Sequence, residues 1–96
     1  MADEVYQKNI YGSKPFVSFK KVCHDMGAPY DQVELISFHS TSKGMMGECG
    51  LRGGYMELDN IDPYVQGQIL KLRTICLCSN TVGQLMVYVA VYTGID

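Results

Sequence analysis

Apolar residues recur at helical spacing between residues 18 and 26. Positions i, i+3, i+4 and i+7 of this segment are Phe19, Val22, Cys23 and Met26. Residues at this spacing share one face of an α-helix, so the pattern predicts an amphipathic helix over residues 18–26. Gly27 and Pro29 follow directly and indicate where this helix ends.

Two compact apolar segments predict β-strands. The apolar residues of the first segment, 32–39, are Val33, Leu35, Ile36 and Phe38. Their length and composition suit a buried strand, and residues 55–58 predict a second, shorter one. Residues 1–10 are mostly polar, and Val5-Tyr6 within them indicates the carboxyl end of another strand.

The C-terminal half predicts a second helix and leaves the tail open. Asp62-Pro63 is a helix-start signal, with proline at the first helical position. Apolar residues at helical spacing follow, which predicts a helix over residues 63–74. Residues 82–92 are rich in Val and Tyr and favour a strand, although residues 83–86 also suit a helix, so local sequence does not decide.

The order strand, helix, strand, loop, strand, helix indicates an α/β fold with helices covering the sheet. At 96 residues the chain is long enough for one domain at most. Repeats, linkers and low-complexity tracts are absent from the sequence. We therefore expect residues 1–96 to be a single segment of one domain, with no separate small domain.

The charge balance is slightly acidic, since eight Lys and Arg face ten Asp and Glu and give a net charge of -2. The broad positive field that attracts nucleic acid or anionic lipid is missing, so we expect neither partner. The longest apolar run, residues 85–92, is too short to span a bilayer, and the acidic start of the chain is unlike a signal peptide. A cytoplasmic location follows as the expectation.

The four cysteines predict neither a disulfide framework nor a metal site. Only Cys76 and Cys78 are close in sequence, and without a secretory signal we expect reduced thiols. Together with the two histidines, the cysteines do not fall into the spacing of a zinc site. We expect no metal.

The first candidate for chemistry is Lys43, within the polar run Ser40-Thr41-Ser42-Lys43-Gly44. A lysine at the mouth of a buried strand can form a Schiff base with an aldehyde cofactor, while the preceding hydroxyls meet a phosphate. Glycines crowd residues 40–54, which suits backbone that turns sharply or approaches a ligand. The alternative is an ordinary solvated lysine in a polar loop.

Two further signals flank this loop. Arg52 lies among glycines, where its guanidinium could bind phosphate oxygens bidentately, or could simply be a surface arginine in a turn. Asp3 precedes the first strand end, where a carboxylate could pair with a protonated pyridine nitrogen. Tyr6 could donate to a ring hydroxyl. The alternative for both residues is a structural cap.

Together these signals resemble one family. Residues 37–57 read Ser-Phe-His-Ser-Thr-Ser-Lys-Gly-Met-Met-Gly-Glu-Cys-Gly-Leu-Arg-Gly-Gly-Tyr-Met-Glu. This run closely resembles the lysine region of alanine aminotransferases, Asp-Glu-Val-Tyr-Gln at residues 3–7 resembles a strand end of the same family, and residues 67–72 resemble its following helix. The family pattern has a Pro-Pro pair where this chain has Ser79-Asn80.

The resemblance implies part of the large domain of a fold type I pyridoxal-phosphate enzyme, with a mostly parallel sheet. By similarity, Lys43 would bind pyridoxal 5'-phosphate covalently and transfer the substrate proton. Asp3 would hold the ring nitrogen protonated and Tyr6 would bond the ring oxygen. Ser40 and Arg52 would bind the phosphate. Alanine and 2-oxoglutarate, with pyruvate and glutamate as products, are the implied substrates.

Family members are homodimeric and several times longer than this chain. We therefore expect the 96 residues to be an incomplete catalytic core, inactive alone, whose uncovered strand edges invite self-association. One alternative is a non-catalytic segment that acts only through interactions of its exposed strands. Another is a pyridoxal-phosphate enzyme of related chemistry, since relatives with other reactions share the lysine and the aspartate.

Overall fold

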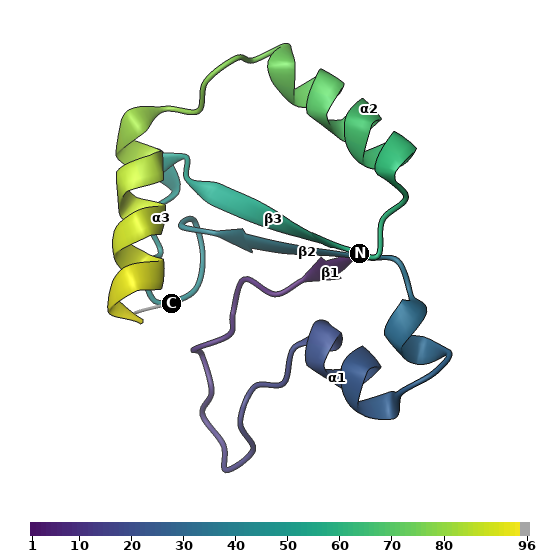
Figure 1. Cartoon of the computed structure of the whole chain (residues 1–96). Coiled ribbons are helices and arrows are strands. Elements are labelled where there is room, and N and C mark those ends of the chain that lie inside the picture. Colours follow the sequence, from purple (N-terminus) through teal and green to yellow (C-terminus); the bar gives the residue numbers. More distant parts are fainter. Residues whose placement is uncertain (95–96) are drawn as a thin grey trace.

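The computed structural model describes residues 1–94, and Figure 1 shows their arrangement. The strands among these residues are β1 (Ala2–Asp3), β2 (Leu35–Ser40) and β3 (Gly54–Asp59). The α-helices are α1 (Phe19–Met26), α2 (Pro63–Thr74) and α3 (Thr81–Thr93). Single 3₁₀ turns cover Tyr30–Gln32 and Cys49–Leu51. The predicted α/β class is confirmed.

The sheet has the strand order β1-β2-β3 and is mixed. β1 runs parallel to β2, with Asp3 opposite Phe38, whereas β3 returns antiparallel to β2 over six paired positions. A parallel return would need a crossover helix, and the segment 41–53 that joins β2 to β3 contains no α-helix. The expected mostly parallel sheet is thus one parallel and one antiparallel pairing in this part of the chain.

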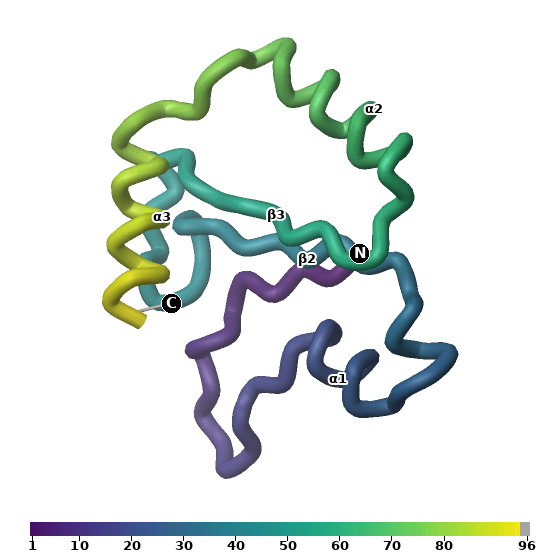
Figure 2. The backbone as a smooth tube through the Cα atoms, viewed as in Figure 1, coloured from purple at the N-terminus to yellow at the C-terminus, as the bar shows by residue number. Residues whose placement is uncertain are grey.

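The first strand is shorter than its sequence suggested. β1 ends at Asp3, and Tyr6 lies beyond it in a turn closed by the Asn9 amide, which donates to the Tyr6 carbonyl at 3.1 Å. The backbone then makes a long excursion before α1 begins (Figure 2). Val5-Tyr6 therefore does not end a strand, because hydrogen bonding to β2 stops after the Glu4 amide reaches the Phe38 carbonyl at 3.1 Å.

The helix α1 confirms the predicted helix at residues 18–26, with Ser18 as its N-cap. The Ser18 hydroxyl accepts a hydrogen bond from the Lys21 amide at 3.1 Å, and Gly27 ends the helix at a φ of 67°. The buried carboxylate of Glu4 accepts from the Phe19 amide at 2.8 Å. This bond ties the start of α1 to the chain that leaves β1.

The helix α2 forms where its start signal predicted it. The Asp62 carboxylate accepts from the amides of Tyr64 and Val65 at 2.8 and 3.3 Å, and Pro63 occupies the first turn. No residue of α2 is buried. Figure 1 shows α2 standing off from the sheet, so little of its apolar surface is covered by the rest of residues 1–94.

The tail, which local sequence left open, is the helix α3. The Asn80 side chain caps it by accepting from the Gly83 amide at 2.8 Å, and Gly94 ends it in the left-handed region at a φ of 67°. Gly83 and Ala90 are buried where α3 packs across one end of the sheet. Among residues 1–94, no helix combines the length and apolar character that crossing a membrane requires.

The buried core of the described residues is small. Its apolar members are Ala2, Leu35, Ile61 and Ala90. By contrast, Tyr64, Leu72 and Leu77 are 74%, 68% and 83% exposed. Burial of apolar surface is the main stabilising term in folding. Much of the apolar surface of residues 1–94 stays exposed and therefore does not contribute to their stability.

Candidate functional site

The loop that joins β2 to β3 is closed at its base by Thr41. Its hydroxyl donates to the Gly53 carbonyl at 3.0 Å and accepts from the Gly53 amide at 3.2 Å. The Thr41 carbonyl also accepts from the Glu48 amide at 2.9 Å. Thr41 is only 2% exposed, so these bonds form out of water and fix where the loop leaves the sheet.

Lys43 lies on this closed loop and is exposed. Its amide donates to the Ser40 carbonyl at 3.5 Å, and its carbonyl accepts from the Gly47 amide at 3.2 Å. Gly44 and Gly47 have φ values of 65° and 60°, a region that residues with a Cβ rarely adopt. The glycines therefore allow the tight turns that present Lys43 at the end of β2.

Asp3 and Ser40 lie on one face of the sheet. Asp3 is paired with Phe38, and side chains two positions apart on a strand point to the same side, so Ser40 follows Phe38 on that face. Both are at the carboxyl ends of the parallel strands, and Asp3 is exposed there. Tyr6 lies three residues after Asp3, in the turn that follows β1, and is 56% exposed.

The Ser40 hydroxyl is held by the backbone of the loop. It donates to the Gly53 carbonyl at 3.4 Å and accepts from the Ser42 amide at 3.1 Å. The donor bond is long, so turning the hydroxyl toward a ligand would cost little. Ser40 is also paired directly with Gly54 across the β2-β3 ladder.

Arg52 adopts the left-handed conformation, with a φ of 53°, and its guanidinium donates from Nη1 to the Cys49 carbonyl at 3.0 Å. The Asn80 side chain donates to the carbonyls of Leu51 and Arg52 at 3.0 and 3.3 Å. No carboxylate among residues 1–94 forms an ion pair with Arg52. Its remaining guanidinium donors are therefore available to an anion.

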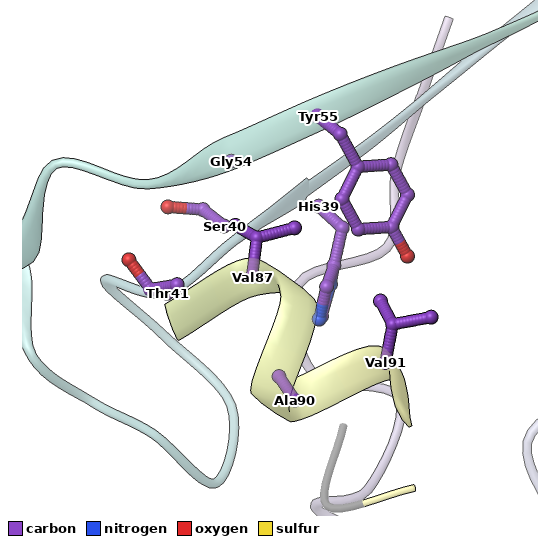
Figure 3. A pocket seen from close by; sticks show the side chains of 8 residues that line it. All are labelled: His39, Ser40, Thr41, Gly54, Tyr55, Val87, Ala90 and Val91. Carbon is purple, nitrogen blue, oxygen red and sulfur yellow. The ribbon is translucent and has the colours of Figure 1, made fainter. Parts of the chain in front are cut away.

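Two hollows meet at Gly54, and Figure 3 shows the first of them from close by. Ser40 and Thr41 line it together with His39 and Tyr55, whose rings meet edge to face at a centroid distance of 5.6 Å. Its opposite wall comes from α3. Arg52 lines the neighbouring hollow, which shares Gly54 and the same helix.

The structure thus brings the predicted site residues together in part. Asp3 and Ser40 share a sheet face, and Ser40 and Arg52 lie on either side of the Gly53-Gly54 pair. Lys43 is on the loop between them, and Asp3, Tyr6 and Lys43 line neither hollow. Residues 41–53 therefore form the candidate site, with Lys43 and Arg52 in the loop and Ser40 directly before it.

Sequence reasoning missed two residues that hold this loop. Thr41 closes its base, and Asn80 ties α3 to Arg52. A signal for Asn80 is present, since asparagine directly before a helical segment is a common N-cap, but the strand-like composition of the tail obscured it. Thr41 carries no such signal, because its partner Gly53 lies across the loop.

The cysteines and the acidic residues build no metal centre in the described part of the chain. All four cysteines are free thiols, and no three His, Cys, Asp or Glu side chains of residues 1–94 gather closely enough to hold a metal ion.

The chain matches no protein-family model, but individual relatives are close. It is 58% identical over 89 residues to a probable mitochondrial alanine aminotransferase of Dictyostelium discoideum, a match covering 91% of the chain and 17% of that protein. Alanine aminotransferase 1 of Bos taurus is 58% identical over 93 residues, covering 95% and 19%. Alanine aminotransferase 1 of Homo sapiens is 59% identical over 86 residues, covering 88% and 17%.

Similarity of this degree, over a loop that carries the lysine, defines the chain as a segment of an aminotransferase. It belongs to the alanine aminotransferase family. The chain spans 17% to 19% of the length of these three relatives.

The expected cytoplasmic location is wrong on this comparison. The relative from Dictyostelium discoideum is named a probable mitochondrial enzyme, so similarity to this family does not imply a cytoplasmic location.

Proposed function

We propose that residues 1–96 are part of the pyridoxal-phosphate-binding core of an alanine aminotransferase, which exchanges alanine and 2-oxoglutarate for pyruvate and glutamate. One observation carries this proposal beyond similarity: Asp3 and Ser40 share a sheet face at the carboxyl ends of parallel strands, and Lys43 follows directly. Ligands of α/β folds bind at these strand ends. The donor set fits the cofactor, because it combines an amine, a carboxylate and a free guanidinium.

Lys43 is the proposed catalytic residue. Its amine is exposed on a loop whose base Thr41 fixes, so it can bind the cofactor aldehyde covalently and then act as base and acid at the substrate α-carbon. When bound, pyridoxal phosphate supplies a ring that withdraws electrons from that carbon. Neither role requires a rearrangement of the sheet.

The other residues would bind and orient the cofactor. Asp3 would accept a hydrogen bond from the protonated ring nitrogen, which keeps the proton there. Ser40 and Arg52 would hold the phosphate from the two sides of Gly53-Gly54, close to where they now lie. Tyr6, exposed in the turn three residues after Asp3, would donate to the ring oxygen.

A non-catalytic role is the second candidate, favoured by the exposed apolar residues of α2 and of the segment after it. Large exposed apolar patches mark interaction surfaces. In this case the chain would act by docking on other polypeptide and would take up cofactor without preference among its lysines. Related pyridoxal-phosphate reactions are a third candidate, because they use the same lysine and aspartate.

The proposal is tested by trapping the cofactor. Pyridoxal phosphate is added to the 96-residue chain, the adduct is reduced with borohydride, and the modified lysines are mapped by mass spectrometry. We expect Lys43 to carry most of the label, and Lys43→Ala to lose it. Lys71→Ala, which removes an exposed lysine from α2, is the matched control and should leave the pattern unchanged. A label spread evenly over all lysines would refute the proposal.

A further inference from the structure

A third hollow lies between β3 and residues 75–80, the segment that joins α2 to α3. Two arginines line it, Arg52 from the loop that joins β2 to β3 and Arg73 from the last turn of α2. No Asp or Glu of residues 1–94 lines it, although acidic residues outnumber basic ones in the whole chain. The hollow is therefore a local concentration of positive charge.

Two neighbouring residues contact the Arg73 side chain and the Arg52 backbone. The Ser79 hydroxyl accepts from Nη2 of Arg73 at 3.2 Å. The Asn80 side chain donates to the Arg52 carbonyl at 3.3 Å and caps α3 at the same time. The segment between α2 and α3 thus links one arginine to the other through short polar contacts.

Both guanidiniums keep unused hydrogen-bond donors. Arg52 gives one donor to the Cys49 carbonyl and Arg73 gives one to Ser79, out of the five that each guanidinium carries. Neither forms an ion pair with a carboxylate of residues 1–94. A dianionic group between them would satisfy donors that the described residues leave to water.

We propose that Arg73 joins Arg52 in binding the phosphate of a phosphate monoester in this hollow. The proposal rests on the assignment of Arg52 to a phosphate and adds a second guanidinium to it. Ser40 does not line this hollow, so the two arginines would hold the phosphate here without it. A phosphate monoester suits two guanidinium groups better than a carboxylate does, because it offers three free oxygens and up to two negative charges. Phe38, Tyr55 and Met56 also line the hollow and give an organic ester an apolar surface to contact.

This arrangement depends on Ser79 and Asn80, where the resemblance to the family leads us to expect two prolines. Proline side chains neither donate nor accept hydrogen bonds. Here the serine hydroxyl and the asparagine amide make the contacts that hold Arg73 and Arg52. Arg73 is therefore a binding residue that resemblance to the family does not assign.

Inorganic phosphate is the probe, titrated into the 96-residue chain at constant ionic strength and followed by calorimetry. We expect Arg73→Gln to weaken phosphate binding by roughly tenfold, as expected for loss of a charge-assisted hydrogen bond. Arg52→Gln should weaken it at least as much. Lys71→Gln removes the same charge from the same helix, outside the hollow, and should change the affinity little. Circular dichroism checks that each variant folds.

The outcomes separate this inference from the aminotransferase proposal. Equal phosphate affinity for Arg73→Gln and Lys71→Gln would overturn it, even if Lys43 were labelled by pyridoxal phosphate. Selective weakening by Arg73→Gln would support it. If that weakening were found without a specific Lys43 adduct, the phosphate site would stand while the aminotransferase proposal failed.

Discussion

At the residue scale, side chains that bond to the backbone hold the candidate site together. Thr41 makes two hydrogen bonds to Gly53 at the base of the loop, and Asn80 reaches the carbonyls of Leu51 and Arg52. Such bonds cost little side-chain entropy when the residue is short. They position Lys43 and Arg52 without contacting any ligand themselves.

An ion pair far from the loop gives the chain a pH dependence. Lys20 Nζ lies 2.5 Å from Glu57 Oε1 and 3.8 Å from Asp59 Oδ1, joining α1 to β3. The hydrogen bond to Glu57, and then its charge, raise the pKa of Lys20. A pKa raised on folding stabilises the folded chain fully below the unfolded value of about 10.4, and that stabilisation is lost as pH rises through the folded pKa.

We therefore predict that urea unfolding of the wild-type chain loses more stability above about pH 10.4 than that of Lys20→Gln. The difference should be small, because both side chains are about half exposed. Lys8→Gln, a change at another exposed lysine, serves as the control and should follow the wild-type curve. Parallel alkaline curves for Lys20→Gln and wild type would show that the pair contributes nothing.

At the element scale, the close approach of α3 to the loop depends on Gly83. A Cβ at this position would lie 2.7 Å from Asn80 Nδ2 and 2.8 Å from the Leu51 carbonyl oxygen. Both atoms belong to the contacts that hold Arg52. Gly67 in α2 offers a contrast, because a Cβ there meets nothing within 4 Å.

We predict opposite effects for the same substitution in these two helices. Gly83→Ala should lower the free energy of unfolding by about 1–3 kcal/mol, because backbone must shift to admit the methyl group. Gly67→Ala should raise it by about 0.5–1 kcal/mol, since alanine restricts the unfolded chain and favours the helix. Urea denaturation measures both. A stabilising Gly83→Ala would mean that α3 does not pack against the loop as described.

Two of the three helices were predicted from their start signals, and the third was left open despite its cap residue. Ser18 and Asp62-Pro63 mark the starts of α1 and α2 in the sequence, and both helices form there. The helix α3 has Asn80 as its cap but a Val- and Tyr-rich body, which local propensity assigns to a strand. Packing of its buried Ala90 against the sheet end decides the conformation, and this contact is not visible locally.

At the scale of the whole molecule, the relative placement of the predicted site residues depends on contacts that no local sequence pattern shows. The register that places Asp3 opposite Phe38 joins segments far apart in the chain, so no local pattern predicts it. Local sequence also placed Tyr6 at the end of the first strand, but this strand ends three residues earlier, at Asp3. The roles proposed for these residues come from similarity to alanine aminotransferases. The common sheet face of Asp3 and Ser40 comes from the pairing of β1 with β2.

The exposed surface fits a chain that is a small part of its relatives. A helix with no buried residue, such as α2, retains little of the stabilisation that packing gives helices. The chain spans less than a fifth of the relatives it matches.

We propose that Asp3, Ser40, Lys43 and Arg52 bind one molecule of pyridoxal phosphate. An amide NMR titration of the 96-residue chain with the cofactor tests this binding. We expect the largest shifts at these four positions and their neighbours, while α1 is unaffected. Shifts scattered over the exposed lysines, with none at Asp3 or Arg52, would contradict it.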